Sequence, residues 1–446
     1  MPSDFRAVGR PFLSQVADPP GIYRPRHPER SVFYRVIEGN LRTYLGTYED
    51  RFEPRHGPLR AVVARAAEAF LECGRLQNGF ARIRCPQCAG EHLLAFSCQT
   101  RNFCPSCQAK RAALFAERLI GEVLLPVPHR HVVFTVPRAL RGLLERERRL
   151  LGLVSRCAYE AVRRTWVEGF GDRHAAPGMA ASIQTFGSYA NFHPHIHTIV
   201  TDGVMTREGR FLPLPQWTPK VVEEVFRRLV VSRLVRAERL SEEFAEVLLG
   251  WERSGFSVYG EQVVLWDETE RLDRLLRYVT RAPMAFGVVE ETEEGKVRVR
   301  TPVDPRTGER DVVMDPVEWI HAVGRQVPDP RQHMVRYYGA YANRSRRHWQ
   351  GRMGLAAWGD PDAPRAHSEE PGSRPGARTG SWARLLRRIL EVDPLWCPRC
   401  GVEMKVISAL TEPAVVDGIL EHVKRRGDRD PFGERGPPGE ASVRMG

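Results

Sequence analysis

Apolar positions recur along the chain with two different spacings. Spacing of three or four residues predicts helices at 33–48, 59–72, 110–122, 139–166, 219–250 and 268–281. Shorter β-branched and aromatic runs predict strands at 131–136, 181–186, 192–200 and 257–266. The strands at 181–186 and 192–200 are separated by Gly-Ser-Tyr-Ala-Asn, which suits a turn, so they predict a hairpin. The fold class indicated is α+β, with a mainly antiparallel sheet flanked by helices.

Composition divides the chain into seven parts. We expect a basic arm at 1–30, a helical, cysteine-rich N-terminal domain at 31–120, a central α+β domain at 121–290, an aromatic and basic region at 291–358, a linker at 359–380, a small C-terminal cysteine-containing module at 381–425 and a disordered tail at 426–446. The linker prediction depends on its content of Pro, Gly, Ser and charged residues.

The charge balance favours a polyanionic partner. Against 55 acidic residues stand 67 Lys and Arg, which gives a formal net charge of +12, mostly from arginine. No apolar run is long enough to span a bilayer, and the first residues hold charges and prolines where a secretory signal has an apolar core. We therefore expect a cytoplasmic protein without membrane contact.

Eight of the nine cysteines gather in two parts of the chain, which favours zinc over disulfides in a chain of this size. Cys85 and Cys88 form one CxxC pair, and Cys104 and Cys107 form another after 15 intervening residues. Two such turns facing each other supply the four thiolates of a tetrahedral zinc site. The sequence thus predicts one structural Zn²⁺ on these four cysteines, without an open position for catalysis.

The other clustered cysteines are candidate extra zinc ligands: Cys73, Cys98, Cys397 and Cys400. For the first two, the alternative is that they are small buried residues. The C-terminal pair alone cannot close a tetrahedral site, and the nearest histidine in sequence is His422. Whether that pair binds zinc or forms a packed turn stays open at this point.

Three histidines share one face of the predicted strand at 192–200. Residues two apart point the same way on a strand, so His193, His195 and His197 lie together. Imidazoles on one strand face suit a divalent metal better than a core. In the predicted hairpin Gln184 lies opposite His195, which makes Gln184 the third-ligand candidate, with His193 as the alternative.

A tyrosine lies at the edge of the apolar stripe of the helix predicted at 268–281. Tyr278 has Arg274 one turn before it and Arg281 one turn after it. A phenol oxygen can form a covalent bond to phosphate and later leave again, and nearby arginines can bind that phosphate. Tyr278 is therefore a candidate nucleophile, although an amphipathic core tyrosine on a basic helix would show the same pattern.

A second group interleaves aromatic and basic residues, which suits base stacking and phosphate contact along single-stranded DNA. Its members are Arg336, Tyr337, Tyr338, Tyr341, Arg344, Arg346 and Arg347. We expect this cluster to bind DNA, and its tyrosines are rival nucleophiles.

These motifs, in this order, resemble the rolling-circle insertion-sequence transposases with an N-terminal zinc-binding domain, the insertion sequence 91 family. The resemblance lies in blocks at 70–74, 79–85, 97–107, 129–135, 184–187, 192–197, 277–278, 333–339 and 393–401. It includes the pair His195 and His197, the histidine–hydrophobic–histidine (HUH) motif of nucleases that nick single-stranded DNA.

The resemblance implies an HUH nuclease core at 121–290 and a DNA transposase that holds Mg²⁺ or Mn²⁺. Its partners would be single-stranded transposon ends and target DNA, joined through a 5′-phosphotyrosine at Tyr278. Members with two tyrosines place them four residues apart, whereas this chain has Arg274 at the earlier position, so it resembles the single-tyrosine branch. Two other functions stay open: a replication initiator or relaxase with the same chemistry, and a zinc-ribbon DNA-binding protein without catalysis.

Overall fold

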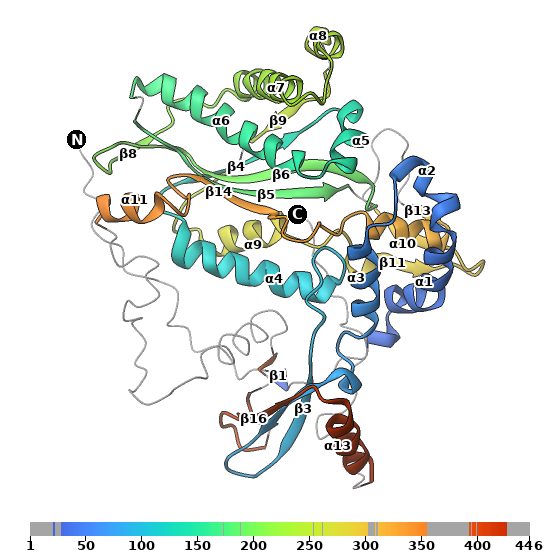
Figure 1. Ribbon diagram of the computed structural model, residues 1–446. Helices are drawn as coiled ribbons and strands as arrows, with labels where there is room; N and C mark the ends of the chain where they lie inside the picture. The colour runs from blue at the N-terminus through green and yellow to red at the C-terminus, as the bar shows by residue number, and fades with distance from the viewer. Residues whose placement is uncertain are drawn as a thin grey trace. The chain divides into compact units, whose positions relative to one another are not determined.

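The computed structural model describes three stretches of the chain (Figure 1). They are residues 21–22, 28–354 and 392–425, apart from residues 173, 188, 253, 261, 302–307, 309–310, 394 and 398. The predicted linker at 359–380 and tail at 426–446 lie outside the described residues, as does most of the predicted arm at 1–30.

Two compact units share the chain. The small unit combines residues 1–26, 75–96 and 372–435, and the large unit combines residues 27–74, 97–371 and 436–446. The chain leaves the large unit after Gly74 and returns to it at Ser97, so residues 75–96 are an insertion in sequence. The residues expected to form one N-terminal domain at 31–120 are divided between the two units.

The large unit is built around an antiparallel sheet of six strands, with the order β10-β4-β6-β5-β14 and with β9 also paired to β4. The strands are β4 (His129–Thr135), β5 (Gly178–Phe186), β6 (Phe192–Thr201), β9 (Ser257–Tyr259), β10 (Val263–Val264) and β14 (Val335–Gly339). The predicted hairpin is confirmed, because β5 and β6 are antiparallel neighbours and Gln184 lies opposite His195. The expected combination of helices with a mainly antiparallel sheet is confirmed as well.

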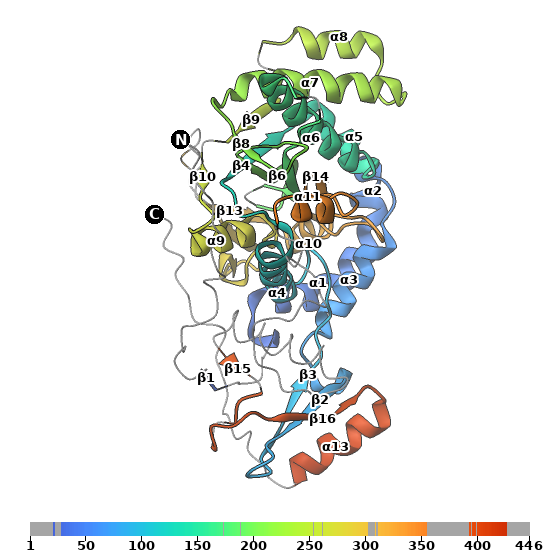
Figure 2. The same ribbon diagram turned by 90° about the vertical axis from the view of Figure 1, so that its left-hand side faces the viewer.

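Helices cover both faces of this sheet (Figure 2). One face carries α5 (Arg138–Arg146), α6 (Leu150–Phe170) and α7 (Pro219–Arg236), with α8 (Glu242–Gly250) against α7, and the other face carries α4 (Pro105–Arg118) and α9 (Thr269–Val279). On β6, Ile196 belongs to the core beneath α6 and α7, whereas Ile199 belongs to the core beneath α4 and α9. Side chains alternate along a strand, so the odd-numbered residues of β6 face α9.

A third core of the large unit joins the N-terminal helices to a later part of the chain. It contains α1 (Val32–Arg51), α3 (Ala61–Leu71), α10 (Pro316–Gly324) and a sheet of β11 (Val289–Glu291), β12 (Val297–Arg300) and β13 (Asp311–Met314). Phe33 of α1 packs edge-on against Trp319 of α10, with ring centres 4.7 Å apart. The segment predicted as a separate region at 291–358 therefore does not stand alone. Its β12, β13 and α10 belong to this core, and its β14 belongs to the central sheet.

The small unit contains a three-stranded antiparallel sheet with the order β16-β2-β3. Its elements are β2 (Phe80–Arg84), β3 (Glu91–Ala95), β16 (Lys405–Leu410), the turn η2 (Leu76–Asn78), the helix α13 (Pro413–Arg425) and the parallel pair β1 (Gly21–Ile22) and β15 (Val392–Asp393). A strand from the C-terminal part of the chain therefore completes a sheet begun by an N-terminal hairpin.

The remaining elements of the large unit are short. They are α2 (Glu53–His56), α11 (Arg346–Arg352), β7 (Gly203–Met205), β8 (Phe211–Pro213), the 3-10 helices η1 (Pro28–Arg30) and η4 (Phe286–Val288), and the π-helix η3 (Leu119–Val123). Of the helices in the described stretches, none has both the length and the apolar character needed to cross a membrane.

Gly339 ends β14 in the left-handed region, with φ +56°, and offers a test of how β14 is held. A Cβ atom there would overlap the carbonyl oxygen of Pro177 and lie 2.6 Å from the hydroxyl of Tyr159. We expect Gly339→Ala to lower the free energy of unfolding by about 2–4 kcal/mol in urea denaturation. Gly46→Ala in α1, where nothing lies within 4 Å, should be neutral or stabilising by up to about 1 kcal/mol. Equal stabilities of the two variants would contradict the placement of β14.

Candidate active site and cysteine clusters

The three histidines of β6 lie in a row on the sheet face that α9 covers. The ring centres of His193 and His195 are 5.6 Å apart, and those of His195 and His197 are 4.9 Å apart. His197 is buried, with 5% of its surface exposed, and His195 is partly buried. Burial lowers the pKa of His197 to about 2 and also lowers the pKa of His195, so both imidazoles are neutral at pH 7 and keep a lone pair for a ligand.

Hydrogen bonding determines which nitrogens of His195 and His197 are free. Nδ1 of His195 lies 2.8 Å from the carbonyl oxygen of His193, so it holds the proton of the neutral ring. The other nitrogen, Nε2, lies 3.1 Å from Nε2 of His197. Two nitrogens at adjacent positions around one divalent ion, each about 2.1 Å from it, are separated by about 3 Å. The two Nε2 atoms therefore have the spacing of metal ligands.

His131 of β4 is a neighbour that sequence analysis missed. Its Nε2 lies 2.9 Å from Nδ1 of His197, and the two rings are within 7° of parallel with centres 5.2 Å apart, as an in-plane N–H···N bond requires. Burial lowers the pKa of His131 to about 4, so its ring is neutral at pH 7, and its Nε2 can accept from His197 Nδ1 in the tautomer that leaves His197 Nε2 free for a ligand. His131 thus orients His197. Only the pairing of β4 with β6 reveals this, because the sequence does not give that register.

Gln184 of β5 connects the histidines to α9. Its Nε2 donates to the carbonyl oxygen of Val279 at 2.8 Å. A carbonyl only accepts, so this bond fixes which end of the amide is nitrogen. The other end, Oε1, is buried and has no hydrogen-bond partner among the described residues. An unpartnered buried oxygen opposite His195 fits a third metal ligand.

Tyr278, in the last turn of α9, lies beside the histidines. Its ring is edge-on to those of His197 and His131, with centres 5.5 Å and 6.5 Å apart, and 46% of the residue is exposed. The guanidinium of Arg281 lies over the ring, 4.9 Å from its centre. Arg274 is exposed and forms a 3.8 Å ion pair with Glu270. The tyrosine is therefore accessible to a large substrate next to the metal-ligand candidates.

Arg141 of α5 is a second residue that sequence analysis missed. Its Nε is buried without a hydrogen-bond partner among the described residues, and its charge contributes, after burial, to the lowered pKa of both His193 and His195. Together with Arg281 it places positive charge beside the histidines, which suits a bound phosphate. The sequence offers no signal for it, because Arg141 is one of many arginines on amphipathic helices.

The aromatic and basic cluster at 336–347 differs from the expectation. Residues 335–339 form β14, so strand alternation places Tyr337 in the core under α4 and α9 and Tyr338 in the core under α6. Tyr338 donates to Ser155 Oγ at 2.9 Å. Tyr341 is fully buried, and its hydroxyl accepts from the amide of Leu125 at 3.2 Å. The predicted DNA contact by Tyr341 is therefore wrong, since its ring is part of the core.

The arginines of that cluster also differ in exposure: some are buried in part and others are exposed. Arg336 packs against Gly152 of α6, and its Nε is buried. Arg346 is half-buried, and its Nη1 has no partner among the described residues. Arg344 and Arg347 are exposed. Only these last two meet the surface requirement of the predicted DNA-binding role.

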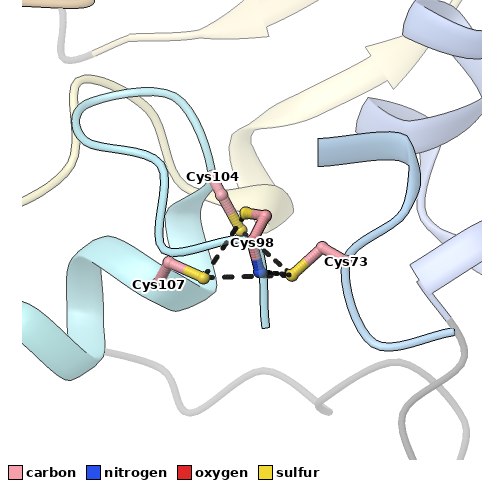
Figure 3. A group of neighbouring side chains, drawn as sticks. All are labelled: Cys73, Cys98, Cys104 and Cys107. Atoms are coloured by element: carbon pink, nitrogen blue, oxygen red, sulfur yellow. Dashed lines mark hydrogen bonds between the residues drawn. The ribbon is translucent and has the colours of Figure 1, made fainter. Parts of the chain in front are cut away.

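The first cysteine cluster consists of Cys73, Cys98, Cys104 and Cys107, whose sulfurs all lie within 4.8 Å of one another (Figure 3). The Cys73 sulfur is 3.9 Å from those of Cys104 and Cys107, and the Cys98 sulfur is 3.6 Å from that of Cys107. A tetrahedral zinc with bonds of 2.3 Å separates its sulfurs by about 3.8 Å. Cys104 caps α4 and Cys107 lies in its first turn, where the helix dipole stabilises thiolates.

The predicted grouping of Cys85 and Cys88 with Cys104 and Cys107 is corrected by this geometry. The hairpin of β2 and β3 places Cys85 and Cys88 in the small unit, whereas Cys104 and Cys107 begin α4 in the large unit. Each CxxC pair instead lies beside two of the cysteines that the sequence offered only as extra zinc ligands. Cys85 and Cys88 form a second cluster with Cys397 and Cys400.

Two family models match the chain. A family described as "Transposase zinc-binding domain" matches residues 42–136, and one described as "Putative transposase" matches residues 178–348. The chain is 28% identical to "Putative transposase y4qJ" of Sinorhizobium fredii (strain NBRC 101917 / NGR234), over 67% of this chain and 79% of that protein. It is 24% identical to the transposase for insertion sequence element IS801 of Pseudomonas savastanoi pv. phaseolicola, over 80% and 86% respectively. No solved structure matches the chain.

The spacing of the two Nε2 atoms leads to a binding prediction. Changing both His195 and His197 to Ala should abolish Mn²⁺ binding in isothermal titration calorimetry, because both imidazole ligands are lost. His348→Ala removes an exposed histidine of α11 and should leave Mn²⁺ affinity unchanged. Wild-type affinity in the double variant would show that the histidine row is not a metal site.

Proposed function

This chain belongs to the insertion sequence 91 family of transposases, and we propose that it nicks and rejoins single-stranded DNA through a covalent bond to Tyr278. As a transposase, it acts on DNA. The observation that supports the finer chemistry is the position of the exposed Tyr278 ring, 5.5 Å from His197 between ring centres. Packing does not require a helix tyrosine and strand histidines to lie side by side at this place. A phosphate that binds to both would explain why they do.

The residues present fit a divalent metal ion. His195 and His197 would hold it through Nε2, and Gln184 would add Oε1, the buried oxygen without a partner. His193 remains the alternative third ligand. Bound Mg²⁺ or Mn²⁺ would polarise the scissile phosphate and stabilise its developing charge. His131 would hold the His197 ring in the orientation that presents Nε2.

Tyr278 would act as the nucleophile. Its phenol oxygen forms a bond to phosphorus while the bond between phosphorus and the 3′ oxygen breaks. The proton that the phenol loses is balanced by the one that the leaving 3′ oxygen takes up, with water as the carrier, so the products are a 5′-phosphotyrosine and a free 3′-OH. In the reverse reaction a 3′-OH attacks the phosphotyrosine, which rejoins the DNA and releases Tyr278. Phenolate is a good leaving group for this step.

Two arginines would bind the phosphate during this exchange. Arg281 lies over the Tyr278 ring, and Arg141 lies near His193 and His195 with a buried nitrogen that has no partner among the described residues. A guanidinium can donate two parallel hydrogen bonds to phosphate oxygens, which orients the group as well as neutralising it. The exposed Arg274, Arg344 and Arg347 would contact flanking phosphates.

The first cysteine cluster would hold a structural Zn²⁺ in the region that matches the zinc-binding family. All four thiolates are protein ligands, which leaves no open position for substrate. The chain leaves the large unit just after Cys73 and returns just before Cys98, so this zinc would hold together the two ends of the insertion.

The nucleophile is tested by Tyr278→Phe, which removes only the hydroxyl. We expect folding and DNA binding to persist while the covalent protein–DNA adduct disappears in denaturing electrophoresis of a labelled single-stranded transposon end. Tyr259→Phe, which changes another exposed tyrosine of the same unit, should form the adduct at the wild-type level. An adduct in Tyr278→Phe would move the nucleophile elsewhere and end this proposal.

The orienting role of His131 gives a separate prediction. His131→Ala should weaken Mn²⁺ binding and slow nicking by about 10–100-fold, with little change in the KM for DNA, because the His197 ring loses its acceptor. His131→Gln keeps a hydrogen-bond acceptor and should recover part of both losses. If Mn²⁺ affinity is the same in His131→Ala and wild type, His131 has no orienting role.

A further inference from the structure

The second cysteine cluster brings together parts of the chain that are far apart in sequence. Cys85 and Cys88 follow β2, whereas Cys397 and Cys400 precede β16. The sulfurs of Cys88 and Cys397, separated by 309 residues, lie 3.7 Å apart, and all four sulfurs lie within 4.8 Å of one another. A disulfide needs about 2.05 Å, whereas the edge of a zinc tetrathiolate is about 3.8 Å long. The spacing is therefore that of a metal site.

The two cysteine turns share their backbone hydrogen bonds. In the first, the amide of Cys85 donates to the carbonyl of Gly90 at 2.8 Å, and the amide of Ala89 donates to the carbonyl of Cys85 at 3.1 Å. In the second, the amide of Cys397 donates to the carbonyl of Val402 at 2.9 Å, and the amide of Gly401 donates to the carbonyl of Cys397 at 2.9 Å. Two segments far apart in the chain, each with the sequence Cys-Pro-X-Cys, thus share one hydrogen-bonding pattern, with equal offsets from the first cysteine.

The conformation of the residue after each second cysteine is also shared. Ala89 has φ +56° and Gly401 has φ +63°, both in the left-handed region. For a residue with a Cβ atom this conformation costs roughly 1–2 kcal/mol, so Ala89 is held there by the rest of the turn. The amide of Cys88 also points to the sulfur of Cys85, at 3.5 Å. These turns are built to present sulfur atoms, and they face each other.

The apolar core around the cluster is small. Besides two of the cysteines, the buried cluster contains Ile83, Leu94, Leu395 and Met404. Small units with so few buried side chains usually need a metal or disulfides for stability. None of these four cysteines forms a disulfide, which leaves the metal.

We propose that Cys85, Cys88, Cys397 and Cys400 bind a second structural Zn²⁺, which fastens the C-terminal segment at 392–425 to the β2–β3 hairpin as a zinc ribbon assembled from both ends of the chain. The matched family regions end at residues 136 and 348, so neither reaches Cys397. The site is independent of the proposed nicking chemistry. It makes the C-terminal module and the hairpin one folding unit, and it answers the question of the missing ligands for the C-terminal pair.

Cysteine alkylation of the wild-type protein tests this without any mutation. Cys88 is exposed, so as a free thiol it would react readily with iodoacetamide, whereas a zinc-bound thiolate is protected. We expect mass spectrometry to show Cys88 and Cys400 unmodified in the native protein and modified after zinc is removed by a chelator. The buried Cys157 should stay unmodified in both states until the protein is denatured. Equal alkylation of Cys88 before and after chelation would overturn the proposal.

Zinc stoichiometry is the second measurement. Full-length wild-type protein should contain two zinc ions per chain by elemental analysis, and Cys397→Ser with Cys400→Ser should contain one. Cys157→Ala, which removes the cysteine outside both clusters, should keep two. Two zinc ions in the Cys397→Ser, Cys400→Ser variant, or one in the wild type, would overturn the proposal whether or not the protein nicks DNA.

Discussion

The candidate active site depends on one constraint, which is that β6 is buried on both faces. Phe192, Ile196 and Val200 on one face belong to the core beneath α6, so the strand cannot rotate or shift by one residue without burying imidazoles in that core. The opposite face therefore presents His193, His195 and His197 in a fixed row. A metal site on a loop would lack this rigidity. Here burial of a large apolar core stabilises the strand, so the histidines are in position before a metal binds.

The same sheet also fixes the tyrosine helix. Gln184, one strand away from the histidines, donates to carbonyl groups at the C-terminal end of α9, where the last carbonyls of a helix lack partners of their own. Leu272 and Leu276 of α9 are buried in the core that this helix forms with α4 and the sheet. The distance between Tyr278 and the histidines is thus set by secondary structure elements, whereas Arg281 follows the end of α9 and lies over the rings of Phe186 and Tyr278.

Local patterns predicted the parts of this site that depend on local physics. The alternation of side chains along a strand predicted that the three histidines share one face. The short turn of the hairpin allows few pairing registers, which predicted that Gln184 lies opposite His195. Contacts between distant segments could not be predicted. The pairing of β4 with β6 was needed to find His131, and β14 was hidden because Tyr and Arg also suit a DNA-binding surface. The grouping of Cys85 with Cys104 is wrong because residues close in sequence need not be close in space, and the neighbour of Cys88 is Cys397.

The strand order of the small unit has a consequence for synthesis of the protein. On the ribosome, β2 is complete about 320 residues before its partner β16 exists. At 5–20 residues per second, roughly 15–60 s pass in which one edge of β2 has unpaired amide and carbonyl groups. Such an edge readily pairs with another chain, and charged side chains are the usual protection. Of the two arginines on β2, Arg82 is paired with Glu91 of β3, so the exposed Arg84 is the charge that suits protection of this edge until β16 covers it.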